Sequence, residues 1–96
     1  MSVTKRDVCN QFHNSINVEQ VGKKQLFIVS YTGYRLLVSY YTIVGIATDL
    51  GGRWRLTKQR YRVTTSKQIT QFLQMHEGGL VDQTELDNLL SEYHEK

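Results

Sequence analysis

The sequence predicts an α+β domain: an antiparallel sheet of three to four strands, with an amino-terminal helix and two carboxy-terminal helices. Residues 25–48 are dense in β-branched and aromatic residues, which favour strands. Residues 65–93 place apolar residues three and four apart, the spacing of helices that pack on one face. The 96 residues fit a single domain. It divides into 1–22 (helix and first strand), 25–76 (sheet and helix core) and 80–96 (acidic last helix).

The first helix is expected over residues 4–13, because Thr4 can cap it and Asp7 follows three residues later. Val8 and Phe12 then share one helix face. Residues 16–21 alternate in polarity and predict the first strand, which ends at a turn over 22–24.

The central sheet is expected to contain strands over 25–31 and 34–48, with a turn at Gly33. Both alternating sets of side chains in 34–48 are largely apolar, which indicates one long strand covered on both faces, and Gly45 marks a bulge or a close approach. A strand over 53–63 follows a hairpin loop, and it needs a bulge within 57–60 to keep its apolar residues on one side. The predicted core of the domain is Leu26, Ile28, Leu36, Val38, Tyr40, Val44, Ile46, Trp54, Leu56, Ile69, Phe72 and Leu73.

Two helices are predicted after this sheet. Thr65 and Gln68 form a capping box for the first, which ends at the glycine pair 78–79. The second covers 82–94, and its apolar stripe is a candidate interaction surface made of Leu86, Leu89, Leu90 and Tyr93. Because so short a helix is marginal alone in water, the stripe must pack on its own domain, on a second copy or on another partner.

Charge is unevenly distributed along the chain, whose net charge is +3. Residues 23–76 contain nine basic residues against one acid, whereas 77–96 contain six acids against one lysine. A bulge within 57–60 would bring the basic residues of the 53–63 strand onto one face. This face is the candidate site for a partner or a nucleic acid: Arg53, Arg55, Arg60 and Arg62, with Lys58 and Lys67 at its edge. Three explanations remain open: an acidic partner, neutralisation by the chain's own acidic tail, or protection of a sheet edge from aggregation.

The segments Ser39-Tyr-Tyr-Thr42 and Tyr61-Arg-Val-Thr-Thr-Ser-Lys-Gln-Ile69 resemble a family of small uncharacterised phage proteins. That family has a Ser-Tyr-x-Thr strand and a Tyr-Ser-x-Thr-Thr-Ser-Lys-His/Gln-Ile helix start, followed by an aromatic residue, here Phe72. Arg62 departs from the small polar residue of the pattern. The resemblance covers about residues 36–73 and implies a phage origin and a compact sheet-plus-helix unit, but no activity. These residues also have a structural explanation, since Thr-Thr-Ser can cap a helix and Ser39–Thr42 would lie in the central strand.

The sequence shows no motif typical of a catalytic, phosphate-binding or metal-binding site. We find no phosphate-binding glycine motif and no nucleophile with a nearby base. The single cysteine excludes an internal disulfide. Cys9 and His13 lie four apart, but two ligands are too few for zinc. We therefore expect a protein that is not an enzyme and has no metal or cofactor.

The longest uncharged apolar stretch, over 36–48, is shorter than the roughly 20 residues of a membrane-spanning helix. We expect no membrane association and a soluble protein in the cytoplasm of an infected bacterium. The expected function is that of a phage accessory protein that binds a host or viral protein through charged surfaces. The alternative is a nucleic-acid-binding module that uses the basic face of the sheet, and homodimerisation through the last helix is a further expectation.

Overall fold

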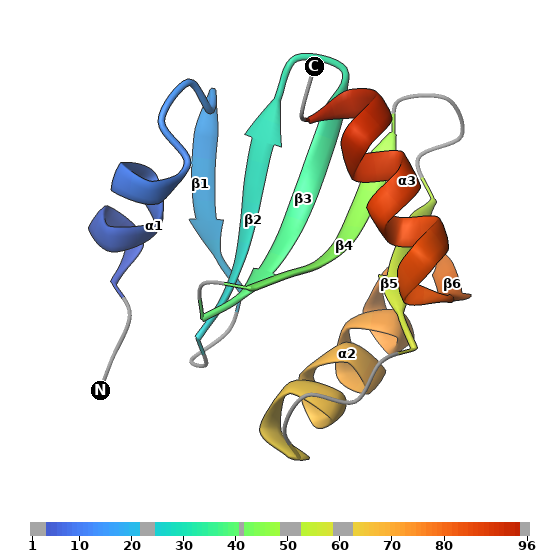
Figure 1. The fold of residues 1–96 in the computed structure, drawn as a ribbon. Coiled ribbons are helices and arrows are strands. Elements are labelled where there is room, and N and C mark those ends of the chain that lie inside the picture. The colour runs from blue at the N-terminus through green and yellow to red at the C-terminus, as the bar shows by residue number, and fades with distance from the viewer. Residues whose placement is uncertain (1–3, 22–24, 41, 49–52, 59–62, 95–96) are drawn as a thin grey trace.

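The computed structural model describes residues 4–21, 25–40, 42–48, 53–58 and 63–94. The order of elements is α1 (Lys5–Gln11), β1 (Asn17–Gln20), β2 (Leu26–Tyr31), β3 (Tyr34–Ser39), β4 (Thr42–Thr48), β5 (Trp54–Thr57), α2 (Val63–Met75), β6 (Gly78–Val81) and α3 (Gln83–Tyr93). The strands form one six-stranded sheet in sequence order, β1 to β6 (Figure 1). The predicted α+β class is confirmed. The sequence predicted three to four antiparallel strands. The sheet instead has six strands, and its last pair, β5 and β6, is parallel.

The parallel pair consists of β5 and β6, which are joined by α2. The glycine pair 78–79 was expected to end a helix, because glycine is common just after a helix C-terminus. It forms a strand because Gly78 lies directly against β5. A Cβ atom at this position would lie 2.8 Å from Trp54 Cβ and would also meet the Trp54 carbonyl oxygen. Only glycine allows this close approach.

The expected long strand over 34–48 is a hairpin. β3 and β4 pair antiparallel, with Ser39 opposite Thr42, and Tyr40 in the turn has φ +57°. The Ser39–Thr42 motif therefore lies at a turn rather than inside a strand, and Tyr40 is half-buried rather than part of the core. The apolar residues on both sides of the turn concealed it, because no glycine or asparagine marks its position. The register of this pair shifts between Leu37 and Val38, which is the irregularity predicted near Gly45.

The strand expected over 53–63 ends at Thr57, and Val63 already belongs to α2. Thr65 therefore lies within the helix and is not its capping residue, which corrects the predicted capping box. The β-branched residues at 63–65 favour a strand by propensity, but burial of the helical stripe that contains Ile69 and Phe72 outweighs this preference. The second half of the predicted bulge within 57–60 lies outside the described residues, as do Arg60, Tyr61 and Arg62.

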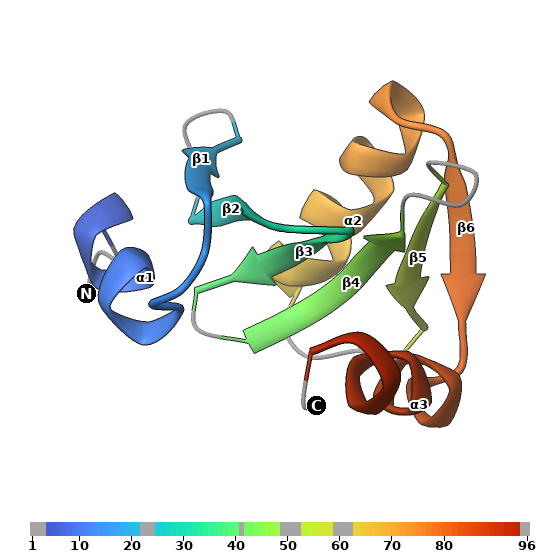
Figure 2. The same ribbon diagram turned by 90° about the horizontal axis from the view of Figure 1, so that it is seen from above.

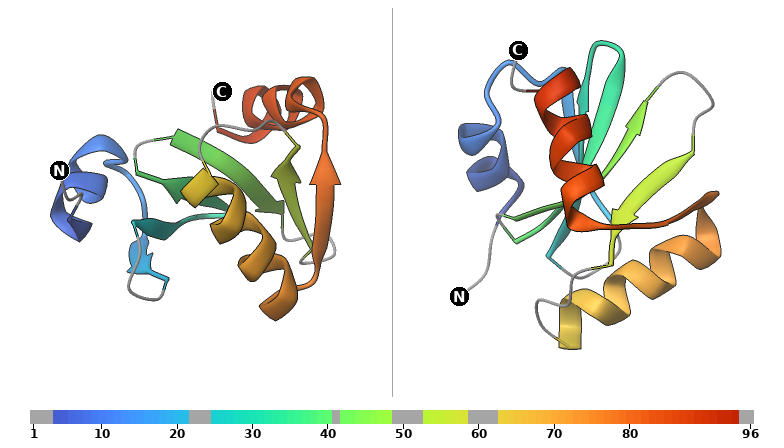
Figure 3. Two further views of the ribbon diagram at one scale, coloured as in Figure 1. Left: turned by 90° about the horizontal axis from the view of Figure 1, so that it is seen from below. Right: turned by 45° about the vertical axis from the view of Figure 1, so that its right-hand side comes forward.

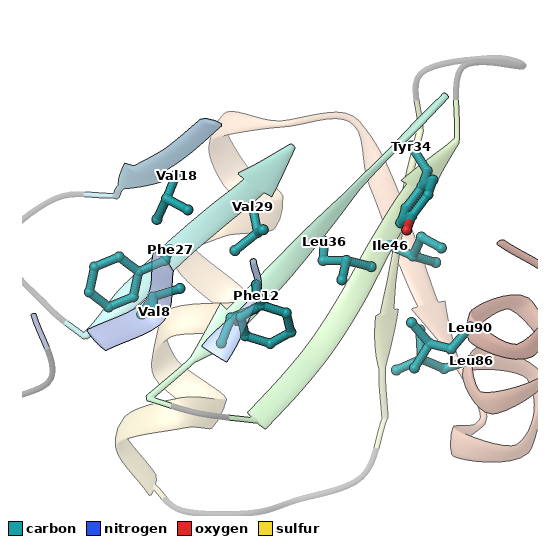
Figure 4. Packing of buried hydrophobic residues seen from close by; sticks show 11 residues of the cluster. Val8, Phe12, Val18, Phe27, Val29, Tyr34, Leu36, Ile46, Leu86 and Leu90 are labelled. Atoms are coloured by element: carbon teal, nitrogen blue, oxygen red, sulfur yellow. The ribbon is translucent and has the colours of Figure 1, made fainter. Parts of the chain in front are cut away.

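The sheet is covered on both faces. α1 and α3 lie on one face and α2 on the other, as Figures 2 and 3 show. The first face contributes the cluster Val8, Phe12, Val18, Phe27, Val29, Tyr34, Leu36, Val38, Ile46, Leu86 and Leu90 (Figure 4). The second contributes Leu26, Ile28, Leu37, Val44, Ala47, Trp54, Leu56, Ile69 and Phe72. The predicted core is buried except for Tyr40 and Leu73, which are half-buried.

Two predicted helices have the expected local features. Thr4 caps α1: its hydroxyl oxygen accepts from the Asp7 N–H at 3.2 Å, and its own N–H donates to Asp7 Oδ2 at 3.0 Å. The hydrogen bond from the Thr4 N–H to the carboxylate, and next the side chain of Thr4, lower the pKa of the Asp7 carboxyl. In α3, Leu86 and Leu90 are buried in the core while Leu89 and Tyr93 pack at its edge. Of the alternatives for this stripe, the structure shows packing on the chain's own sheet.

Candidate functional site

Charged side chains flank the β5–β6 pair at both ends. Arg53 Nε lies 3.8 Å from Glu77 Oε1, and Lys58 Nζ lies 3.8 Å from Asp82 Oδ1. Arg55 lies between them on β5, half-buried on the face that α3 covers. We call Arg53, Arg55, Lys58, Glu77 and Asp82 the charged margin. Because all four paired side chains are largely exposed, each ion pair is worth only about 0–1 kcal/mol.

The charged margin is held by the buried part of β5. Trp54 and Leu56 point into the core beneath α2, with Trp54 only 2% exposed and its ring edge-on to Phe72 at 5.1 Å. On the opposite face, the Thr57 hydroxyl donates to Gln83 Oε1 of α3 at 2.6 Å. The cations are thus presented at defined positions by a short, firmly packed strand. The buried indole of Trp54 cannot stack on a nucleic-acid base.

The predicted basic face is only partly assembled in the described residues. Arg53, Arg55 and Lys58 come together on or beside β5, whereas Lys67 lies on α2 and is exposed there. Sequence analysis missed Arg35, whose guanidinium carbon lies 5.2 Å from the centroid of the Trp54 ring. Arg35 and Trp54 are both paired with Ala47, from opposite sides of β4, and no local pattern could indicate this pairing.

Ser39 and Gln68, one from each of the two motif segments, meet in the interior. The Ser39 hydroxyl at the end of β3 donates to Gln68 Oε1 of α2 at 2.8 Å, and both residues are 2% exposed. In the part of the chain that the structure describes, Gln68 Nε2 is a buried donor without a hydrogen-bond partner. These motif residues therefore connect the sheet to α2, which supports the structural explanation of the motif.

Removing the Ser39 hydroxyl is expected to lower the free energy of unfolding by about 1–2 kcal/mol, because Ser39→Ala leaves the buried Gln68 amide without this partner. Gln68→Met should cost less, since it removes the unpaired donor as well. The double variant should be more stable than Ser39→Ala alone. Urea unfolding of the three variants measures these differences, and equal stability of Ser39→Ala and the double variant would contradict the explanation.

An aromatic cluster joins the end of α3 to the β2–β3 hairpin. Tyr31 and Tyr34 stack with ring centroids 4.9 Å apart, and the Tyr34 hydroxyl lies 3.0 Å from His94 Nδ1. Burial raises the pKa of both tyrosines, and Tyr34 raises that of Tyr31 further. The cluster fixes α3 across the sheet.

Cys9 lies on α1, and His13 lies just after this helix. Among the described residues, no three side chains of His, Cys, Asp or Glu are placed to hold one ion together. The His13 ring nitrogen Nδ1 instead lies 3.2 Å from the Asn10 carbonyl oxygen. Within the same residues, no helix has the length and apolar character needed to span a membrane.

Comparison with known proteins places the chain in a family. The model of DUF8033, a family of unknown function, matches residues 10–88. The chain belongs to this family. The matched region runs from the end of α1 into α3, so the whole sheet and α2 are part of the DUF8033 domain. No curated protein and no solved structure matches the chain.

Proposed function

We propose that this DUF8033 chain is a non-enzymatic phage protein that binds a host or viral protein through the charged margin. The observation that carries the proposal is the alternation of charge there: Arg53 and Lys58 each lie 3.8 Å from a carboxylate. A surface with cations and carboxylates side by side complements a protein surface of mixed charge, and such complementarity gives specificity. The phage origin rests on the motif resemblance alone.

A nucleic-acid partner is less well supported by the same surface. The Glu77 and Asp82 carboxylates would stand near any phosphate that approached Arg53 or Lys58, and phosphate contacts supply most of non-specific nucleic-acid affinity. In addition, the buried Trp54 is not available as a stacking platform. Both features favour a protein.

The proposal predicts that inverting the charge pattern abolishes binding without unfolding the domain. We would combine Arg53→Glu with Glu77→Arg, and Lys58→Glu with Asp82→Lys. This variant keeps the net charge and leaves an opposite charge at each pairing position, so its free energy of unfolding should change by less than about 1 kcal/mol. Its affinity for the partner should fall at least about tenfold, because like charges then face each other across the interface.

The measurement begins with capture from a lysate of the bacterial host by the tagged full chain, with and without nuclease. The captured protein is then purified and titrated with the parent and the charge-inverted variant. Equal affinity for both chains would contradict the charged margin as the binding surface. Capture that disappears with nuclease, together with salt-dependent affinity of the parent for an oligonucleotide, would indicate the nucleic-acid alternative.

A further inference from the structure

The two free edges of the sheet differ in how they are protected. β1 and β6 lie at the two ends of the strand order. β1 carries the charged Glu19 among polar residues, a common protection against edge-to-edge pairing. β6 has the sequence Gly-Gly-Leu-Val, with no charge and no proline, and its Leu80 is 49% exposed. Among the residues that the structure describes, no strand pairs with the outer edge of β6.

The hydrogen bonds to β5 show which backbone groups of β6 are open. The Trp54 N–H donates to the Glu77 carbonyl and the Lys58 N–H donates to the Val81 carbonyl, each at 2.9 Å. In a parallel pair, alternate residues bond to the same neighbouring strand. Residues 77, 79 and 81 therefore face β5, and the N–H and C=O groups of Gly78 and Leu80 point away from it.

We propose that β6 pairs antiparallel with β6 of a second copy of this chain, around a two-fold axis at Gly79. In this register Gly78 of each copy lies opposite Leu80 of the other, so every outward N–H of 78–80 meets an outward C=O. The two sheets then form one continuous sheet. The outward N–H and C=O groups of β6 therefore match those of a second β6. A strand from another protein would need groups at the same positions.

The side chains around the axis are compatible with this pairing. Gly79 meets Gly79 of the second copy at the non-hydrogen-bonded position, where the Cα atoms come closest. The exposed Leu80 side chain lies opposite Gly78, which has no side chain to obstruct it. At each end, Glu77 of one copy comes nearest Asp82 of the other, and Arg53 and Lys58 pair with these carboxylates from the β5 side. Each end therefore contains two cations and two carboxylates and carries no net charge.

The dimer is expected to be weak. So short a strand pairing falls below the roughly 1,200 Å² of a standard interface, which implies a dissociation constant on the order of micromolar or above. The inference concerns the backbone edge and goes beyond the proposed function. It is tested with the purified chain alone, so its failure leaves the partner-binding proposal standing.

Sedimentation of the full chain over a range of micromolar concentrations should show a concentration-dependent shift from monomer to dimer. Gly79→Glu should abolish the shift, because two carboxylates would then face each other at the axis. This variant should still fold, since a Cβ at Gly79 meets no atom within 4 Å and Arg55 is the register partner of position 79. The matched control Thr84→Glu adds the same charge at an exposed position of α3 and should dimerise as the parent does.

A cross-link identifies the register. In a Cys9→Ser background, Gly79→Cys should form a covalent dimer on oxidation, because the two thiols would lie across the axis. Asn88→Cys, at an exposed position of α3, should not form one at the same concentration. A parent chain that stays monomeric throughout overturns the proposal. So does a Gly79→Glu variant that dimerises like the parent, or equal cross-linking at the two cysteine positions.

Discussion

Phe27→Ala is expected to lower the free energy of unfolding by about 3–5 kcal/mol, the largest effect of any substitution considered for this chain. Phe27 is fully buried in β2 and belongs to the cluster that contains Val8 of α1 and Phe12 just after it (Figure 4). The substitution leaves a cavity between the sheet and that helix. Because β2 lies inside the sheet between β1 and β3, its backbone cannot move to fill the space.

The matched control for Phe27 is an exposed apolar residue. Ile16 is 69% exposed just before β1, so Ile16→Ala should change stability by less than about 0.5 kcal/mol. Urea unfolding of both variants, followed by circular dichroism, measures the difference. If Phe27→Ala cost less than about 1 kcal/mol, the packing of α1 against β2 would be wrong.

Gly78→Ala is expected to lower the free energy of unfolding by about 2–3 kcal/mol, because the added methyl group collides with backbone. It would lie 3.0 Å from the Trp54 carbonyl carbon and 2.8 Å from its Cβ, and it would also meet the carbonyl oxygen. β5 cannot retreat, since Trp54 is buried against Phe72 of α2. The parallel pair between β5 and β6 must therefore open locally.

The neighbouring glycine provides the control for Gly78. A Cβ at Gly79 meets no atom within 4 Å, so Gly79→Ala should leave stability within about 0.5 kcal/mol of the parent. Thermal unfolding at low protein concentration, with Trp54 fluorescence as the probe, compares the two variants. Equal stability of Gly78→Ala and Gly79→Ala would contradict the parallel placement of β6 beside β5.

The sheet also explains how a basic middle and an acidic carboxy-terminal region coexist in one chain. β6 brings Glu77 and Asp82 back beside Arg53 and Lys58, which are distant from them in sequence. Of the three explanations for the charge asymmetry, neutralisation by the chain's own acids thus applies to these two cations. Arg55 lies between these two cations on β5 and is half-buried.

Local features were predictable because neighbouring residues produce them. Thr4 and Asp7 are three residues apart, so the cap of α1 depends on that short segment alone. Gly33, with φ +91°, forms the turn between β2 and β3 where the sequence predicts one. The helical stripes that contain Phe72 and Leu86 follow from apolar spacing, and both residues are buried.

Other features of the fold depend on contacts between residues far apart in the chain. β6 is a strand because β5 accepts a glycine backbone at close range, and no periodicity within Gly-Gly-Leu-Val indicates that contact. The Ser39–Gln68 hydrogen bond and the Arg35–Trp54 contact likewise join separate elements. Phe27 was missed because alternation predicts one buried face, whereas α1 and α2 cover both faces of the sheet. Periodicity reports which side of an element is apolar, but the partner that covers it is determined by packing across the whole chain.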